Sequence, residues 1–142
     1  MSACTFFGHR DCYGLEAARL RDTLEDLIAR GVDTFYVGHQ GRFDAMAFRI
    51  LQQLEQKYAH LSVMVVLATL PRQKSAYDAY TLYPEGMESV PPRFAVDRRN
   101  HWMLDRSDYC VCYVNHPWGG AYKYMQRARR SMPVINLGSA TL

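Results

Sequence analysis

The sequence predicts an α/β fold of the Rossmann-like type, a three-layer sandwich with a mostly parallel sheet of about five strands. Three observations lead to this fold class. Short apolar runs alternate with amphipathic stretches, glycines follow several of the runs, and the run LSVMVVLATL at residues 61–70 is almost entirely apolar. Parallel strands need crossover connections, usually helices, and strands covered on both faces are continuously apolar. The pattern therefore favours a parallel sheet with helices on both faces.

The first half of the chain supplies three strands and two helices in alternation. We expect strands at residues 3–7, 34–37 and 61–70, where β-branched, aromatic and other apolar side chains gather. We expect helices at residues 15–29 and 43–58, because their apolar side chains recur at helical spacing.

The second half begins with a Tyr- and Pro-rich segment, residues 71–96, that breaks this pattern. The segment could contain a short helix, and it is too short to form a domain of its own. Beyond it the sequence predicts a helix at 97–106, a strand at 109–115, a helix at 121–130 and a strand at 134–137. Because strands and helices alternate throughout, we interpret residues 1–142 as a single domain.

The composition is that of a globular protein. The chain has 142 residues, of which 49% are hydrophobic and 22% are charged. Its formal charge of +3 is too small to favour nucleic acid or an anionic membrane as the partner. The N-terminus lacks the pattern of a secretory leader, and no apolar stretch approaches the roughly 18 residues of a membrane span. We therefore expect a cytoplasmic protein with no membrane partner.

The cysteines and histidines do not indicate a metal site. Cys110 and Cys112 alternate in an apolar run, so a strand places both on one face without a turn that could bring them to a metal. The five histidines show no His-x-x-x-His spacing. We interpret the two cysteines as packing residues and expect no metal and no cofactor.

Glycines and polar side chains follow three of the expected strands, at the point where each strand ends. The segments are GHRD at residues 8–11, GHQGRFD at 38–44 and NHPWGG at 115–120. In open parallel sheets, ligands bind beyond the carboxyl ends of the strands. Glycine lets backbone N–H groups approach a phosphate, and a helix N-terminus attracts an anion. The sequence thus predicts an anion site at this edge, although each glycine could instead serve a tight turn.

The candidate ligand contacts come from these three segments and from the helix expected at 97–106. They are Gly8, His9, Arg10, Gly38, His39, Gln40, Gly41, Asp44, Arg99, Asn115, Gly119 and Gly120. Arginine pairs with phosphate, His9 could transfer a proton, and Asp44 could accept ribose hydroxyls. Two alternatives stay open, a contact between Arg10 and Asp11 and a helix-dipole role for Asp44.

Three longer motifs carry a family resemblance. They are CTFFGHRD, FYVGHQGRFD and RNHWMLDRSDYCVCYVNHPWGGAYKYMQRA, within a match that runs from residue 4 to about residue 137. In this order they resemble the SLOG superfamily, in its DUF1273 or YpsA-like branch. The superfamily joins the Smf/DprA DNA-processing proteins and the Lonely Guy phosphoribohydrolases, which are Rossmann-like domains for nucleotides or their derivatives. The resemblance implies a nucleotide-derived small molecule as the partner.

The phosphoribohydrolase motif is incomplete in this chain. When the Ser-Asp pair at 107–108 is aligned, Arg99 falls on the catalytic arginine of the Lonely Guy enzymes. Gly119 and Gly120 match two glycines of their Pro-Gly-Gly-x-Gly-Thr-x-x-Glu motif, but Gln126 stands in place of the glutamate. A neutral amide neither stabilises an oxocarbenium ion nor activates water well. The resemblance therefore implies ligand binding without this hydrolysis.

The expected function is binding of a nucleotide or an ADP-ribose-like molecule by a protein that senses or sequesters it, as a phage counter-defence protein would. The alternative is a hydrolase that cleaves an N-glycosidic or phosphoester bond of a nucleotide. There Asp44 or Asp11 would replace the missing glutamate and His9 would act as acid or base. A third interpretation is an interaction protein with a vestigial pocket, or a single-stranded DNA binder, which the small net charge disfavours.

The role of the tyrosines stays open at this point. Tyr77, Tyr80 and Tyr83, together with Arg72, could form a lid that stacks on a base, or the tyrosines could pack a helix on the sheet. The chain has ten tyrosines in all, enough for an aromatic interface, and we expect a homo-oligomer, a dimer or larger.

Overall fold

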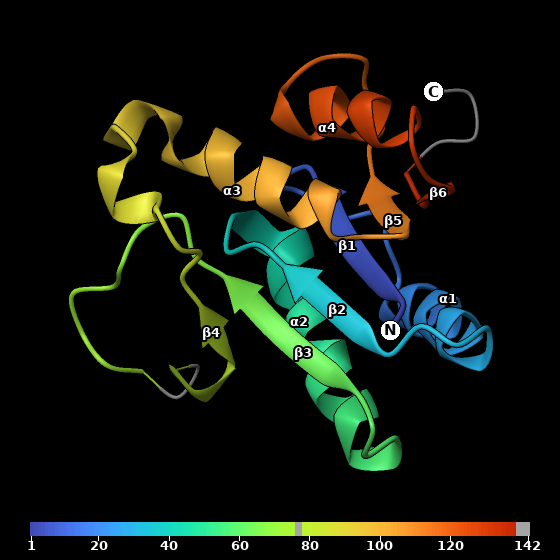
Figure 1. Ribbon diagram of the computed structural model, residues 1–142. Helices are drawn as coiled ribbons and strands as arrows, with labels where there is room; N and C mark the ends of the chain where they lie inside the picture. Colours follow the sequence, from blue (N-terminus) through green and yellow to red (C-terminus); the bar gives the residue numbers. More distant parts are fainter. Residues whose placement is uncertain (76–77, 139–142) are drawn as a thin grey trace.

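In the computed structural model, which describes residues 1–75 and 78–138, one parallel sheet lies between two layers of helices (Figure 1). The sheet has six strands in the order β4-β3-β2-β1-β5-β6. The strands are β1 (Ala3–Gly8), β2 (Thr34–Val37), β3 (Ser62–Val66), β4 (Thr81–Leu82), β5 (Tyr109–Tyr113) and β6 (Val134–Asn136). All neighbouring strands pair in parallel, so the predicted α/β, Rossmann-like sandwich is confirmed.

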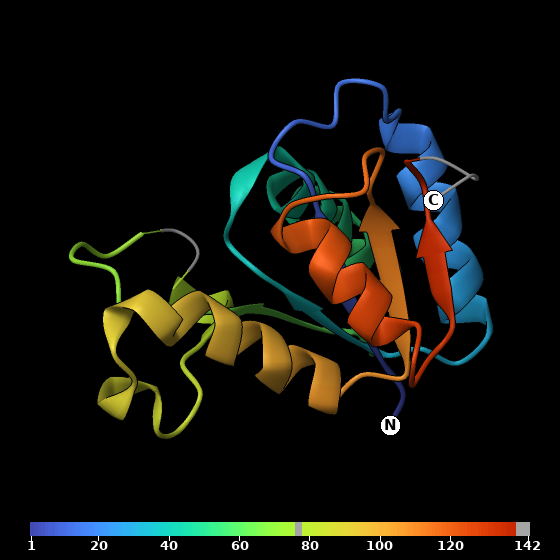
Figure 2. The ribbon, with the colours of Figure 1, turned by 90° about the horizontal axis from the view of Figure 1, so that it is seen from above.

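Four helices cover the sheet, two on each face. They are α1 (Ala17–Ala29), α2 (Gly41–Lys57), α3 (Ala95–Asp105) and α4 (Gly120–Ala128). Helices α1 and α2 lie on one face, and α3 and α4 lie on the other (Figure 2). Right-handed crossovers explain this arrangement, because the chain moves outward from β1 to β3 and then returns past β1 to β5.

The change of direction defines where a ligand site can form. The chain leaves β1 toward the α1 face and leaves β5 toward the α4 face, and these two strands are neighbours. Their carboxyl ends pair as Phe7 with Cys112 and Gly8 with Tyr113. The following loops therefore diverge and open a crevice at the carboxyl edge, the usual ligand position in such sheets.

Each face of the sheet has its own apolar core. On the first face, α1 buries Leu20, Leu24 and Leu27 at helical spacing against the sheet. On the second face, Met103 of α3 and Met125 of α4 pack with Cys110 and Cys112 of β5. The side chains of all four cysteines are buried, as expected for packing residues.

The third strand is shorter than the sequence predicts. The apolar run from residue 61 to 70 suggested one long strand, but β3 ends at Val66. Leu67 and Ala68 remain buried beneath the segment that follows, Ala68 beside Met87 and Ala95, while Leu70 is exposed. An apolar run shows that residues are buried but not that they pair in a strand. The sequence pattern alone therefore could not predict where β3 ends.

The irregular segment contains more structure than expected. It holds three short 3₁₀ helices, at Asp78–Tyr80, Met87–Ser89 and Pro92–Phe94. Between the first two lies β4, whose two residues pair with Val65 and Val66 and form an edge of the sheet. Within the described residues, no helix is both long enough and apolar enough to cross a membrane.

Candidate functional site

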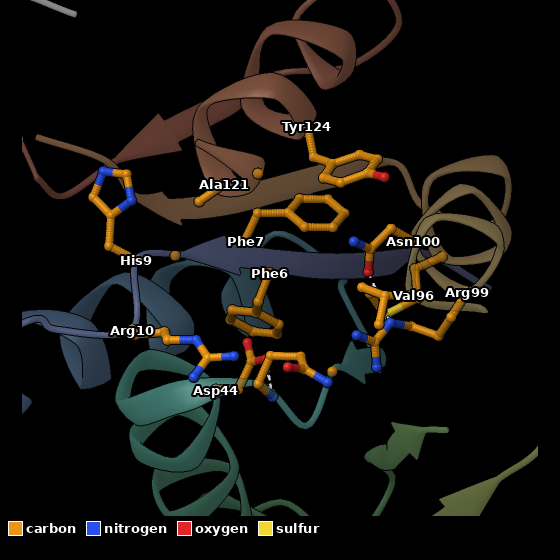
Figure 3. A pocket seen from close by; sticks show the side chains of 15 residues that line it. Phe6, Phe7, His9, Arg10, Asp44, Val96, Arg99, Asn100, Ala121 and Tyr124 are labelled. Carbon is orange, nitrogen blue, oxygen red and sulfur yellow. Dashed lines mark hydrogen bonds between the residues drawn. The ribbon is translucent and has the colours of Figure 1, made fainter. Parts of the chain in front are cut away.

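A pocket of about 290 Å³ lies above the carboxyl ends of β1 and β2, between α3 and α4 (Figure 3). Its size is close to the lower end of the range for small-molecule sites, about 300–1,000 Å³. Four parts of the chain line it: Phe6, Phe7, Gly8, His9 and Arg10; Gly38, Gln40 and Asp44; Val96, Arg99, Asn100 and Met103; and Gly120, Ala121 and Tyr124.

The fold brings most of the predicted contact residues together in this pocket. The candidates that line it are Gly8, His9, Arg10, Gly38, Gln40, Asp44, Arg99 and Gly120. His39 instead lines a smaller cavity of about 160 Å³ that shares Gly38 and Asp44 with the first. Gly41 and Gly119 lie next to lining residues in sequence but do not line the pocket themselves, and Asn115 does not line it either.

Several lining residues were missed by the sequence reasoning. Val96, Asn100 and Met103 share one face of α3 with Arg99, and Tyr124 lies one helical turn after Gly120 on α4. Residues three and four apart lie on one helix face, so this spacing could have identified them once Arg99 and Gly120 were chosen.

Arg99 is a buried cation in the wall of the pocket, with 2% of its surface exposed. Its Nε donates to Asn100 Oδ1 at 2.7 Å, and its Nη1 donates to the Val66 carbonyl at 2.9 Å. Among the described residues no carboxylate forms an ion pair with it, and Nη2 makes no hydrogen bond. Burial lowers the pKa of Arg99, and the attraction of Asp44 partly offsets this. A buried charge of this kind favours an anionic ligand, because it lacks a counter-charge in contact.

Asp44 lies in the first turn of α2 and is buried. Its Oδ2 accepts the backbone N–H of Gln40 at 2.9 Å, and its Oδ1 makes no hydrogen bond within the described chain. Burial raises the pKa of Asp44 to about 6, although the Gln40 N–H and the charge of Arg99 oppose the rise. This carboxyl therefore titrates just below neutral pH and keeps an oxygen free for a ligand.

Gly38 lets these two charged groups approach the end of β2. A Cβ atom at this position would lie 2.9 Å from Asp44 Oδ2 and 3.3 Å from Cζ and Nη1 of Arg99. Any side chain here would push against both groups. Glycine is therefore favoured at position 38 because Asp44 and Arg99 lie close to its backbone, and not because of a turn.

Gly8 lines the pocket and is also required for packing. A Cβ atom on Gly8 would lie 2.3 Å from ring atoms of Phe43, a fully buried residue of α2. Packing of α2 on β1 thus already requires glycine at this position. α2 is also joined to the loop that follows β1, where Arg42 N donates to the Arg10 carbonyl at 2.9 Å.

Two helices begin at the pocket and add positive potential to it. α2 starts at Gly41, after the lining residue Gln40, and α4 starts with the lining residues Gly120 and Ala121. Neither N-cap residue makes a side-chain hydrogen bond to its helix, although the Asp44 carboxylate in the first turn of α2 accepts the Gln40 N–H. First-turn N–H groups and the helix dipole both favour a negative charge. In Figure 3 the side chains of Arg10 and Arg99 lie on opposite sides of Asp44.

Three aromatic rings stack where the loops after β1 and β5 meet. The rings of His9 and His116 are 3.6 Å apart at 10°, and those of His116 and Trp118 are 4.1 Å apart at 25°. His9 Nε2 and His116 Nδ1 are buried without a hydrogen-bond partner in the described chain. Burial and the neighbouring His116 lower the pKa of His9. This shift favours the neutral form of the His9 imidazole, which lines the pocket.

The other groups considered for catalysis lie outside the pocket. Asp11 is exposed and lies 4.0 Å from Arg42 in a loose ion pair. Gln126 is exposed on α4, where its amide donates to the Tyr122 hydroxyl and accepts from Arg129. Among the described lining residues, Asp44 is the one carboxylate.

The tyrosines of residues 71–96 take packing positions where they are described. The Tyr80 hydroxyl donates to Glu55 Oε1 of α2 at 2.8 Å, and its ring meets Phe48 edge-on at 5.2 Å. Tyr83 packs against both the first core and the small cluster around Met87. Neither tyrosine lines the pocket, and Tyr77 lies outside the described residues. A lid that stacks on a base stays a prediction.

Comparison with known proteins adds no family assignment. A scan against protein-family models found no match, and a search of curated proteins found none either. The resemblance of the three motifs to the SLOG superfamily therefore stays a prediction, and the functional argument depends on the pocket itself.

Proposed function

We propose that this protein binds a nucleotide-derived small molecule of the ADP-ribose type in the pocket above β1 and β2, and that it senses or sequesters this ligand. The observation that carries the proposal is Arg99. It is almost fully buried, borders the pocket, has no ion-pair partner among the described residues, and keeps Nη2 free of hydrogen bonds. A ligand phosphate would supply the missing counter-charge.

The rest of the pocket supports a ligand with an apolar, planar part as well as an anion. Arg10 and the N-terminus of α4 favour negative charge at the same site. The opposite wall contains Phe7 and Tyr124, whose rings stack at 5.3 Å, together with Met103. A free inorganic anion would not require this wall, whereas a nucleotide combines phosphate, sugar and an aromatic base.

The pocket supports binding better than turnover. Gln126, at the position where the resemblance implies a catalytic glutamate, lies on the exposed side of α4 and not in the pocket. Hydrolysis of a glycosidic bond needs a carboxylate beside the reacting carbon or beside the attacking water. Nothing on α4 supplies one.

One observation favours a nucleotide hydrolase as the second candidate. Asp44, with its pKa raised to about 6, and a neutral His9 both line the pocket. A carboxyl and an imidazole that line the same pocket are suitable residue types for general acid and general base. In this candidate they would replace the missing glutamate.

The experiment is a calorimetric titration of the protein with ADP-ribose, AMP, NAD and cyclic ADP-ribose, with Gly120→Leu as the key variant. Gly120 lines the pocket and a Cβ atom there would meet no atom within 4 Å, so a leucine adds bulk at the pocket without disturbing the fold. Gln126→Leu is the matched control, because it adds a leucine to the exposed side of the same helix. We expect at least ~10-fold weaker binding for Gly120→Leu and unchanged binding for the control.

Two results would contradict the proposal: no ligand of the panel binds the natural chain, or Gly120→Leu binds as tightly as that chain. Chromatography of each ligand after incubation distinguishes the two candidates. An intact ligand supports a sensor or sequestering protein. Fragments that disappear with His9→Ala or Asp44→Asn would establish the hydrolase.

A further inference from the structure

Resting on the proposed function, we infer that Asp44 and Arg99 form a recognition pair for one ribose phosphate unit. Arg99 binds the anion, and Asp44 accepts hydrogen bonds from the ribose hydroxyls. The pair would thus make the site selective for ribonucleotides over their deoxy analogues, with Asp44 as the residue that determines this specificity.

The first argument is that the two charges are close but not paired. The position of a Cβ atom on Gly38 lies 2.9 Å from Asp44 Oδ2 and 3.3 Å from Arg99 Nη1. Both groups therefore face one small volume at the end of β2. Their charged atoms nevertheless do not come within ion-pair distance of each other. The space between them suits a ligand that presents an anion to one group and hydroxyls to the other.

The second argument is that neutral partners hold each charge in place. Asp44 is tied to the N–H of Gln40, and Arg99 is tied to Asn100 and to the Val66 carbonyl. These contacts fix the orientation of the two side chains before any ligand arrives. A pre-organised site loses less conformational freedom on binding, which raises affinity and sharpens geometric selection.

The third argument concerns the hydrogen bonds that remain available. An ionised carboxylate accepts about four hydrogen bonds, and the described chain supplies Asp44 with one. Arg99 has five N–H donors, of which two are used. The free acceptors on Asp44 match the two adjacent hydroxyls of a ribose, and the free donors on Arg99 match phosphate oxygens.

A purely structural role explains Asp44 less well. A carboxylate that only balances the helix dipole works best when it stays hydrated at the surface. Asp44 is instead buried at the junction of two cavities, at a position that disfavours its ionised form. Such a costly position is typical of a group that a ligand completes.

Selectivity follows from the cost of an unpaired polar group. A site built to hydrogen-bond a substrate hydroxyl discriminates strongly against the analogue without it, because the buried partner loses its bond. The pocket here is open on one side, so we expect a smaller factor than in a closed enzyme site. We predict at least ~10-fold weaker binding when the hydroxyls facing Asp44 are absent.

The test is calorimetric titration with AMP, 2′-deoxy-AMP and 3′-deoxy-AMP. The natural chain should bind AMP at least ~10-fold more tightly than one or both deoxy forms. In Asp44→Asn the amide oxygen can still accept the Gln40 N–H, and we expect the preference to fall below about 3-fold. Asp22→Asn, an exposed acid on α1, is the matched control and should keep the full preference.

The outcomes separate this inference from the proposed function. If the natural chain binds AMP and both deoxy forms equally, the recognition pair is wrong and the proposed function stands. If Asp44→Asn keeps the full preference, Asp44 does not determine specificity. If none of the three nucleotides, nor any ligand of the first panel, binds, the proposed function fails and this inference with it. The natural chain alone shows whether AMP binds more tightly than its deoxy analogues. This comparison tests the recognition pair even if Asp44→Asn does not fold.

Discussion

The two faces of the sheet are built differently, although each is covered by two helices. The α1 and α2 face buries a continuous apolar core that extends from Leu20 of α1 to Leu54 of α2. The α3 and α4 face has a smaller apolar core. It also buries Arg99 and Asn100 and contains the pocket. Apolar burial stabilises a fold, whereas buried polar groups beside a cavity cost stability unless a ligand completes them. The comparison predicts that the first face carries most of the stability, whereas the second face, together with Asp44 at the start of α2, borders the proposed binding pocket.

The largest expected effect is at Phe43 on the first face. Its ring is fully buried beside Phe6 and Tyr113, with the backbone of Gly8 against it. Phe43→Ala leaves a closed cavity, so we expect the free energy of unfolding to fall by about 3–5 kcal/mol. Urea denaturation measures this change.

Met103→Ala tests how much a core side chain of the second face contributes to stability. Met103 is equally buried but borders the pocket, so the space that it leaves joins an open cavity. We expect a loss of about 2 kcal/mol, at the low end for such truncations, because water can enter. A cost equal to that of Phe43→Ala would mean that the two faces contribute alike.

The next effect is a pH dependence of stability that arises from Asp44. Burial raises its pKa from 3.8 to about 6, so the folded state disfavours the ionised form. The contribution of Asp44 is fully present below pH 4 and is lost as the pH rises to about 6. The free energy of unfolding should therefore fall by roughly 2–3 kcal/mol over this range relative to Asp44→Asn.

Urea denaturation of both proteins at pH 4, 5, 6 and 7 measures this difference. Other titrating groups contribute to both proteins and cancel in the comparison. If the free energy of unfolding depends on pH in the same way in both proteins, Asp44 keeps an ordinary pKa in the folded protein. The buried charge at the pocket would then not lower the stability.

A smaller effect is expected at Tyr80, on the first face. Tyr80→Phe removes the hydrogen bond to Glu55 but keeps the ring on Phe48, so we expect a loss of about 0.5–1 kcal/mol. Ligand affinity should not change, because Tyr80 does not line the pocket. A clear loss of affinity in a titration would instead support the lid that the sequence suggested.

The smallest effect is expected at Gln126. Its side chain is exposed and, within the described part of the chain, forms hydrogen bonds with Tyr122 and Arg129, on its own helix and the following turn. Gln126→Ala should change the free energy of unfolding by less than about 0.5 kcal/mol and leave ligand affinity unchanged. A marked loss of affinity would place this residue in the site after all.

Local sequence patterns were enough to predict the fold class and the edge of the sheet where the pocket lies. Alternating apolar runs and helical spacing are local signals, and parallel strands place their carboxyl ends together whatever the details. For this reason His9, Gly38 and Gly120, which are distant in the chain, could be predicted to meet. The same logic could not find the end of β3 or the strand β4, since burial and pairing give similar local patterns.

The contacts that each residue makes at that edge depend on the tertiary structure. Gly8 is required by the ring of Phe43, and Gly38 by Asp44 and Arg99, although both follow strands and look alike in sequence. Asp44 owes its raised pKa to burial, and Arg99 donates hydrogen bonds to Asn100 and Val66 and has no ion-pair partner among the described residues. These properties depend on distances between segments far apart in the chain, and no local pattern encodes such distances.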